Sequence, residues 1–407
     1  MSQERFKYVI AGTGLAGVSA VEGIRELDKD GTILLIGNEK VLPYDRPPLT
    51  KKLWFGKKKI EDIFVHDSSF YSANDVDVRL GIQLTGLNAG AQTITDHTGN
   101  TYHYEKLLLA MGGIPRKLDI PGGNLWGICY YRYLHDYLRV RRDAEEGKSV
   151  VVIGGGFIGS ELAAALRINK VEVTMVFREK HLVSRVFPEG LGRAVQDRFV
   201  EHGVRVISGD VPVKFEKSDG KYVTYTKHGE RLISDIVIAG LGVTPVTNLA
   251  EKAGLPVENG VAVDRYTRTD DPAIYAAGDN AYFPYTAIGE TVRVEHWDNA
   301  LNQGKQAGRN MAGANEPYDY MPYFWSDLFE FGYEAVGDTS SELETFGDWE
   351  IENNTGILYY LNEHKVRGVM ACNIYGKMDE ARDLIRKGRR MTVDDLRGAI
   401  SLKVKAA

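Results

Sequence analysis

Two glycine-rich turns of the same design constrain this chain more than any other feature of its sequence. In each turn an apolar run ends in the pattern Gly-x-Gly-x-x-Gly and opens at once into a run with helical character. The glycines of the two turns are Gly12, Gly14, Gly17, Gly154, Gly156 and Gly159. The first glycine makes the tight turn, the second lets backbone approach a pyrophosphate, and the third lets the helix pack closely on the strand. The sequence therefore predicts two dinucleotide-binding folds.

The residues between the glycines belong to the same predicted sites. They are Leu15, Ala16, Phe157 and Ile158. The free amides and the dipole at the start of each helix hold phosphate charge. Two fingerprints in one chain favour a bound flavin and a diffusible nicotinamide. A glycine-rich strand-to-helix turn without a ligand is the alternative at each position.

Composition limits the class of protein. A chain of 407 residues is long enough for two or three domains, and 43% hydrophobic with 26% charged residues is typical of a globular protein. The net charge of -6 gives no general attraction to nucleic acid or anionic lipid. The N-terminus resembles no signal peptide, and no apolar run is long enough to span a bilayer. We therefore expect a cytoplasmic protein without membrane insertion.

The cysteine count restricts the redox chemistry. The two cysteines, Cys129 and Cys372, are far apart and form no Cys-x-x-Cys pair. This argues against a disulfide scaffold and against a metal site. We expect Cys129 to be a small buried hydrophobic residue rather than a nucleophile.

An acidic residue stands where the first fold needs one. Residues 32–36 form the predicted second strand, and Glu39 follows it about 20 residues past the fingerprint, where a carboxylate accepts a hydrogen bond from an adenosine ribose. A solvated loop glutamate is the alternative. In the second fold Phe177 stands at the equivalent strand end, so that position departs from the usual acid.

The segment 43–51, Pro-Tyr-Asp-Arg-Pro-Pro-Leu-Thr-Lys, is the most specific stretch of the first half. Its prolines predict a rigid loop leading into a helix that carries Lys51. It resembles the ferredoxin reductases that serve Rieske dioxygenases and cytochromes P450, whose relatives include rubredoxin reductases and apoptosis-inducing-factor-like flavoproteins. The resemblance implies that Arg46 and Lys51 contact FAD, with Lys51 near the flavin ring; a surface lysine at a helix start is the alternative.

Further motifs of that family follow in order. Residues 107–116 resemble the family's crossover to the nicotinamide domain, although Met111 replaces a usual threonine. The resemblance implies FAD contacts at positions in both halves of the chain. These positions are Val78, Ala110, Gly112, Arg116, Arg132, Gly278, Asp279, Glu295, His296 and Trp297. For His296, packing is the alternative to a cofactor contact.

The second nucleotide fold leaves the choice of NADH or NADPH open. Residues 177–180 and 187–190 resemble the apoptosis-inducing-factor branch, which implies that Glu179 binds the ribose of NADH. Arg178 and Lys180 are equally suited to the 2′-phosphate of NADPH. The resemblance also puts Glu161 near the nicotinamide and Gly240 and Gly242 against it. Hydride transfer needs positioning above all, so we assign no general acid or base.

The C-terminal part changes character from about residue 320. It is aromatic and strand-like, and residues 384–400 have helical character. The Phe-Trp-Ser-Asp motif at 324–327 resembles the family motif whose tryptophan lies beside the flavin, which makes Trp325 the candidate for the acceptor side. Core packing is the alternative. The residues after this motif are closer to apoptosis-inducing factor than to ferredoxin reductases, so the acceptor stays open.

The predicted architecture is α/β, with two nested Rossmann-type domains and a C-terminal α+β domain, as in glutathione-reductase-like flavoproteins. The predicted boundaries are 1–113 with 243–319 for FAD, 114–242 for NAD(P)H, and 320–407 for the third domain. The expected function is hydride transfer from NAD(P)H to FAD and single-electron transfer to a ferredoxin-type iron–sulfur protein, in a monomer or homodimer. Lys51, Glu161 and Trp325 carry the predicted catalysis. The alternatives are an NADH oxidase or quinone-type reductase, and a redox-sensing interaction protein that responds to NADH.

Overall fold

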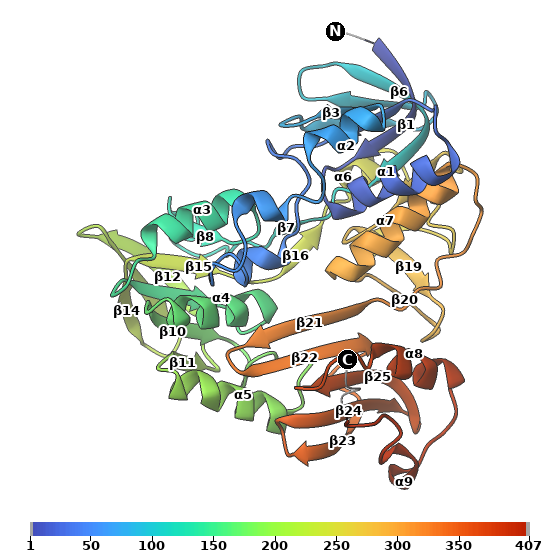
Figure 1. Ribbon diagram of the computed structural model, residues 1–407. Coiled ribbons are helices and arrows are strands. Elements are labelled where there is room, and N and C mark those ends of the chain that lie inside the picture. Colours follow the sequence, from blue (N-terminus) through green and yellow to red (C-terminus); the bar gives the residue numbers. More distant parts are fainter. Residues whose placement is uncertain (1–2, 404–407) are drawn as a thin grey trace. The chain divides into compact units, whose positions relative to one another are not determined.

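The chain folds into two compact units, each built from three separate segments. The computed structural model describes residues 3–403 (Figure 1). The first unit consists of Met1–Asp45, Ile60–Ile114 and Thr244–Pro322, and the second of Arg46–Lys59, Pro115–Val243 and Tyr323–Ala407. The short strands β7 (Gly113–Pro115) and β16 (Val243–Pro245) lie at two of the points where the chain passes from one unit to the other. The division into three domains that the sequence predicts stays a prediction.

A parallel sheet forms the centre of the first unit. Its strands lie in the order β3 (Val76–Arg79), β2 (Ile33–Ile36), β1 (Gln3–Ala11), β6 (Thr101–Leu109) and β18 (Ile274–Ala276). The apolar second half of β1 is buried because both faces of a parallel sheet are covered. The antiparallel strands β5 (Thr93–Asp96) and β4 (Leu84–Asn88) extend the sheet from the first half of β6.

Two helices pack backbone to backbone beside this sheet. They are α1 (Leu15–Leu27) and α7 (Trp297–Met311), side by side in Figure 1. A Cβ added at Gly308 would lie 2.1 Å from the carbonyl oxygen of Ala20, so only glycine permits this approach. The smaller elements of the unit are α2 (Ser68–Ala73), α6 (Asn248–Lys252), the 3-10 turn η2 (Ile60–Ile63), and strands β17 (Val261–Ala262), β19 (Ala281–Tyr285) and β20 (Glu290–Val292).

The second unit repeats the same parallel sheet. Its strands lie in the order β11 (Arg205–Ser208), β10 (Glu172–Phe177), β9 (Ser149–Ile153), β15 (Ile236–Ala239) and β8 (Ile128–Tyr130). The associated helices are α3 (Leu134–Asp143), α4 (Phe157–Ile168) and α5 (Glu189–Glu201). An antiparallel sheet of β12 (Pro212–Ser218), β13 (Lys221–Thr226) and β14 (Arg231–Ser234) completes this part. Two Rossmann-type folds are therefore confirmed.

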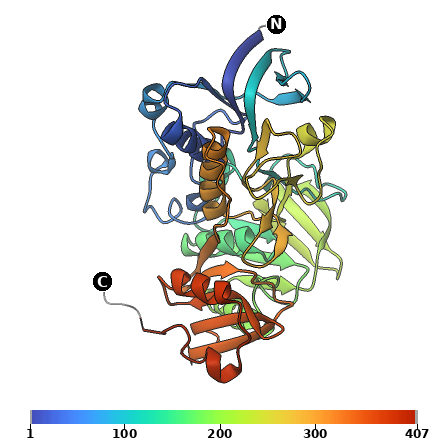
Figure 2. The same cartoon turned by 90° about the vertical axis from the view of Figure 1, so that its right-hand side faces the viewer.

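The C-terminal residues form an antiparallel sheet with helices, which confirms the predicted α+β character. The strand order is β21 (Tyr323–Leu328), β22 (Phe331–Gly337), β25 (Lys365–Cys372), β24 (Thr355–Asn362) and β23 (Glu344–Ile351). Helix α8 (Met378–Lys387) packs on this sheet, in the red part of Figure 2. The helical character predicted over 384–400 is confirmed only in part, because Gly388 ends α8 with φ +57 and Thr392 caps a separate short helix, α9 (Val393–Leu396).

One other predicted helix differs from the structure. The helix expected to carry Lys51 is the 3-10 turn η1 (Pro47–Thr50), and Lys51 follows its end, where the backbone leaves the helical region with φ of -134 and ψ of -99. No helix within residues 3–403 has the length and apolar character needed to cross a membrane.

Candidate nucleotide and redox site

Both glycine fingerprints have the backbone geometry that only glycine allows. Gly12 has φ +128, and a Cβ added there would lie 2.1 Å from the carbonyl oxygen of Ala110. Gly154 has φ +109, and a Cβ there would lie 2.4 Å from the carbonyl oxygen of Gly240. The third glycines, Gly17 and Gly159, would place a Cβ 2.1 and 2.0 Å from the carbonyl oxygens of the first glycines, so each helix lies directly on its turn.

The middle glycines are needed for a different reason. Gly14 and Gly156 stand at the N-caps of α1 and α4 with φ of -94 and -82, which other residues adopt readily. No protein atom lies within 4 Å of a Cβ added at either position, and neither helix has a side-chain cap. Uncapped amides that face open space form the cradle a pyrophosphate requires. Both folds therefore fit a dinucleotide.

The structure brings Glu39 and Glu179 to equivalent positions in the two folds. The amide of Gly12 donates to the carbonyl of Ile36 at 2.8 Å, and the amide of Gly154 donates to that of Val176 at 2.9 Å. Glu39 comes three residues after the first acceptor, and Glu179 comes three residues after the second.

A second pair of hydrogen bonds supports this correspondence. The carbonyl of Glu39 accepts from the amide of Gly81 at 2.8 Å, and that of Glu179 accepts from the amide of Gly209 at 2.9 Å. These two glycines share a left-handed backbone, with φ of +72 and +74. Phe177, which stands where an acid was expected, packs instead on Gly155, where an added Cβ would lie 2.7 Å from its ring.

The remaining predicted residues of the first unit gather at one edge of its parallel sheet. Each of these residues lies near the end of a parallel strand, just after such a strand, or at the start of α7. In open α/β sheets, ligands bind at the edge formed by the carboxyl ends of the parallel strands. Gly112 and Gly278 are held there by hydrogen bonds from their amides to the side chains of Asn280 (3.4 Å) and Gln303 (2.8 Å). The residues at this edge are Val78, Ala110, Gly112, Gly278, Asp279, Glu295, His296 and Trp297.

The start of α7 is fixed by side chains rather than by a helix cap. Trp297 Nε1 donates to Asp45 Oδ1 at 2.6 Å, and Glu295 forms an ion pair with Arg293. His296 is half-buried at the N-cap, and this burial lowers its pKa to about 4, against a smaller opposing effect of Asp279. The imidazole is therefore neutral at pH 7.

The predicted catalytic residues meet in the second unit. Lys51 Nζ lies 3.0 Å from Glu161 Oε1 and 3.3 Å from the carbonyl oxygen of Trp325, and it stands 5.7 Å from the centroid of the Trp325 ring. Lys51 is 7% exposed and Glu161 is 8% exposed. Lys51 is thus no surface lysine, and this cluster joins η1, α4 and β21.

Two hydroxyls that the sequence did not reveal complete this cluster. Thr50 Oγ1 donates to Glu161 Oε2 at 2.5 Å, and Ser326 Oγ donates to Glu161 Oε1 at 2.6 Å. Both residues adjoin predicted ones in the motifs Leu-Thr-Lys and Trp-Ser-Asp. That adjacency was the only signal, because the hydrogen bonds span 111 and 165 residues of sequence.

The other residues of the second unit lie at its turns. Arg46 Nη1 donates to the carbonyl of Arg132 at 3.1 Å, just after β8, and its guanidinium lies over the ring of Tyr133. Arg116 is tied by its amide to the carbonyl of Gly242 at 3.0 Å. Gly240 follows β15, beside the second fingerprint.

The cysteines take no part in this arrangement. Both are buried, and burial raises the pKa of the Cys129 thiol to about 12 and that of Cys372 still further. The prediction of a small buried Cys129 is confirmed. No group of His, Cys, Asp or Glu suited to a metal ion occurs among residues 3–403.

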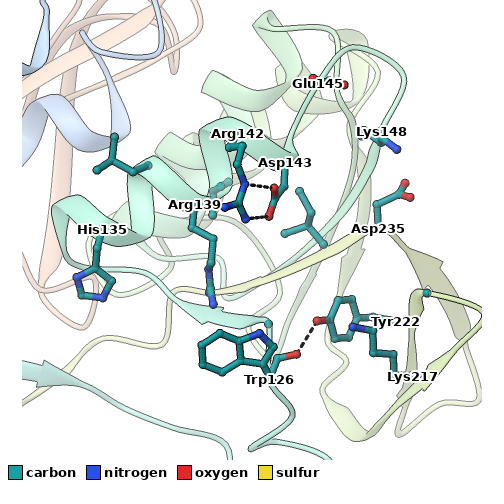
Figure 3. A pocket seen from close by; sticks show the side chains of 15 residues that line it. Trp126, His135, Arg139, Arg142, Asp143, Glu145, Lys148, Lys217, Tyr222 and Asp235 are labelled. Carbon is teal, nitrogen blue, oxygen red and sulfur yellow. Dashed lines mark hydrogen bonds and ion pairs between the residues drawn. The ribbon is translucent and has the colours of Figure 1, made fainter.

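A separate cavity of about 930 Å³ lies against α3 (Figure 3). Figure 3 shows Trp126 and Arg139 at this cavity, and no predicted site residue lines it. Arg142 pairs there with Asp143 at 2.6 Å, and Asp235 accepts from Ser149. Because its lining residues and the predicted site residues do not overlap, the cavity is distinct from the candidate site.

Comparisons with known proteins agree with this geometry. The family described as pyridine nucleotide-disulphide oxidoreductase matches residues 6–304, and that described as apoptosis-inducing factor, mitochondrion-associated, C-term, matches residues 307–355. The chain is 35% identical to mitochondrial apoptosis-inducing factor 1 of Dictyostelium discoideum, over 97% of this chain and 80% of that protein. It is 32% identical to a putidaredoxin reductase of Pseudomonas putida, over 93% of this chain and 91% of that one.

A solved structure has the same fold over nearly the whole chain. In the crystal structure of a covalent putidaredoxin reductase–putidaredoxin complex, the matched chain has a TM-score of 0.90 and 31% identity, over 96% of this chain and 95% of that one. The predicted glutathione-reductase-like architecture is thereby confirmed. The chain belongs to the pyridine nucleotide-disulphide oxidoreductase family and is an FAD-dependent NAD(P)H oxidoreductase of the ferredoxin-reductase type.

Proposed function

We propose that this protein oxidises NADH and delivers electrons one at a time to a ferredoxin-type iron–sulfur protein. When bound, FAD supplies the redox chemistry, taking a hydride from NADH to leave NAD+ and returning the two electrons to two carrier molecules. The observation that carries the proposal is the buried Lys51–Glu161 pair beside Trp325, in a chain whose two cysteines are buried and do not form a Cys-x-x-Cys pair. Without a dithiol relay, electrons pass directly between nicotinamide, flavin and acceptor.

The first fold would hold the FAD. The amides around Gly14 face its pyrophosphate, Glu39 accepts from its ribose, and Asp279 accepts from its ribitol. Arg46 and Lys51 would add positive charge, with Lys51 stabilising negative charge on the reduced ring. The further contacts are those predicted at Val78, Ala110, Gly112, Arg116, Arg132, Glu295, His296, Trp297 and the residues Leu15, Ala16 and Gly17 of the fingerprint.

The second fold would hold the nicotinamide nucleotide. The turn from Gly154 to Gly159, with Phe157 and Ile158, would take the pyrophosphate, and Gly240 and Gly242 would lie against the nicotinamide. Glu161 would hydrogen-bond the carboxamide. The correspondence of Glu179 with Glu39 supports NADH, because a carboxylate that accepts from a ribose hydroxyl repels a 2′-phosphate.

The choice of acceptor rests on the relatives. A putidaredoxin reductase matches over nearly its full length, and one such enzyme was crystallised with putidaredoxin, which supports a small iron–sulfur partner with Trp325 on the acceptor side. The match to apoptosis-inducing factor over 97% of this chain supports a second candidate, an NADH-responsive redox sensor. An NADH oxidase or quinone-type reductase is the third.

Reoxidation separates the three candidates. The purified protein is titrated without oxygen, first with NADH and then with NADPH, while flavin absorbance and any long-wavelength band are followed; air or a ferredoxin is then added. We expect NADH to bleach the flavin absorbance, and we expect that absorbance to recover rapidly only when ferredoxin is added. Rapid recovery of the flavin absorbance in air favours an oxidase. A band that persists in air, with a change of size on adding NADH, favours the sensor.

Replacing Glu179 by Ala is expected to weaken the apparent affinity for NADH about tenfold, because a hydrogen bond to a charged group is lost. The affinity for NADPH should rise or stay unchanged, because the repulsion of the 2′-phosphate is also lost. Steady-state kinetics with both nucleotides measures this ratio. Glu172→Ala, at an exposed glutamate at the start of β10, the strand that precedes Glu179, is the control. An equal fall for both nucleotides would contradict the assignment.

A further inference from the structure

We infer that Ser326 is a positioning residue, which holds the Glu161 carboxylate, and through it the Lys51 ammonium, in the orientation that hydride transfer requires. The inference rests on the proposed function. It names a residue outside the predicted catalytic set, and it gives β21 of the C-terminal part a role in the nucleotide site. Trp325 and Ser326 are neighbours on that strand, so the strand would serve the acceptor side and the nicotinamide side together.

The hydrogen bonds of Glu161 carry the inference. Its carboxylate accepts from Lys51 Nζ at 3.0 Å, Thr50 Oγ1 at 2.5 Å and Ser326 Oγ at 2.6 Å. Lys51 and Ser326 share Oε1, whereas Thr50 contacts Oε2. Because a carboxylate has about four acceptor positions, these three donors leave about one for the nicotinamide carboxamide. Without Ser326, rotation of the carboxylate would turn that position away.

The contact is buried and joins segments far apart in sequence. Ser326 is 2% exposed, so water does not replace its hydroxyl easily. Thr50 belongs to the short insertion 46–59, Glu161 to α4, and Ser326 to the C-terminal segment. These are the three segments that build the second unit, and Glu161 accepts a hydrogen bond from each of the other two. A carboxylate fixed from two sides keeps one orientation, and positioning within about 0.5 Å is what transfer between bound groups needs.

The test replaces Ser326 by Ala and by Thr in the full chain with FAD bound. In anaerobic stopped-flow measurements, Ser326→Ala is expected to lower the limiting rate of flavin bleaching by NADH about tenfold, while the Kd for NADH rises by a smaller factor. Ser326→Thr keeps the hydroxyl and should restore most of the rate. Ser234→Ala is the matched control, a buried serine on β14 whose hydroxyl has no hydrogen-bond partner within residues 3–403.

A second measurement does not depend on turnover. The shift in the urea unfolding midpoint caused by Ser326→Ala is compared in the wild type and in a Glu161→Leu background, where it should largely disappear. An unchanged bleaching rate in Ser326→Ala, an equal loss in Ser234→Ala, or no rescue by Ser326→Thr would each overturn the inference. So would a midpoint shift that persists without Glu161. Failure of NADH to bleach the wild type would instead contradict the proposed function, and the unfolding comparison would still decide whether Ser326 holds Glu161.

Discussion

Valine in place of Gly156 is expected to yield a folded, yellow protein that NADH no longer reduces, whereas valine in place of Gly14 should yield a folded protein without flavin. The two positions are equivalent N-caps in the two parallel-sheet folds. Each substitution therefore fills one nucleotide cradle and leaves the other intact. We expect the loss of apparent affinity to exceed about 100-fold at the filled cradle, because a side chain there takes the place of the pyrophosphate and covers its amides.

The folds themselves should tolerate both changes. No protein atom lies within 4 Å of a Cβ at either glycine, and both backbones have negative φ. The cost of a poorer N-cap residue is about 1 kcal/mol at most, since glycine itself is only a moderate cap. The first and third glycines differ, because valine at Gly12 or Gly159 would collide with a carbonyl oxygen 2.1 or 2.0 Å away and would disrupt the turn.

Three measurements check this pair. Circular dichroism shows whether each variant is folded, the ratio of flavin absorbance to protein absorbance gives the flavin content, and an anaerobic NADH titration gives the nucleotide affinity. Gly90→Val, at an exposed turn where the nearest atom to an added Cβ is Asn88 Oδ1 at 3.8 Å, is the control for general damage. Loss of flavin in both variants, or retention of NADH reduction in Gly156→Val, would show that the two cradles do not have separate ligands.

Features of the fold that depend only on a short stretch of sequence could be predicted from the local residue pattern. The fingerprints, the strands that precede them and the position of Glu39 follow from runs of fewer than about 25 residues, and the periodicity of such runs reports their structure directly. For Glu179 the sequence left NADH and NADPH open, since Phe177 broke the expected pattern. The structure aligns Glu179 with Glu39, because the first glycine of each fingerprint donates to the residue three positions before the glutamate. The preference for NADH stays a proposal.

Features that depend on distant contacts were not predictable in this way. The Thr50 and Ser326 hydrogen bonds to Glu161 arise only when three remote segments meet. The helix expected to carry Lys51 is only the 3-10 turn η1, because the backbone leaves the helical region at Lys51, whose side chain reaches Glu161 on a remote segment. Residues 384–400 have helical periodicity, but Gly388 interrupts it with a left-handed backbone that allows the chain to leave α8.

Replacing Lys51 by Met is expected to reduce the rate of flavin bleaching by NADH at least about 100-fold, since a buried charge that stabilises the reduced flavin is lost. The same change leaves the Glu161 carboxylate buried without its cation. Breaking a buried ion pair from one side costs about 3–5 kcal/mol of stability. The Lys51→Met protein should therefore be both slow and less stable, and either effect alone would lower its activity in a simple assay.

The double variant Lys51→Met with Glu161→Gln separates the two effects. The neutral amide keeps hydrogen-bonding groups for Thr50 and Ser326, and no buried charge is left unpaired, so stability should return to within about 1 kcal/mol of the wild type. The bleaching rate should stay low, because the ammonium is still missing. Urea unfolding and anaerobic stopped-flow measurements on the wild type, both single variants and the double variant give the complete cycle. Lys52→Met, at the exposed neighbouring lysine, is the control for a changed surface charge. Recovery of the rate together with stability would mean that Lys51 serves only to neutralise Glu161; a low rate in a stable double variant would instead assign its charge to the reaction.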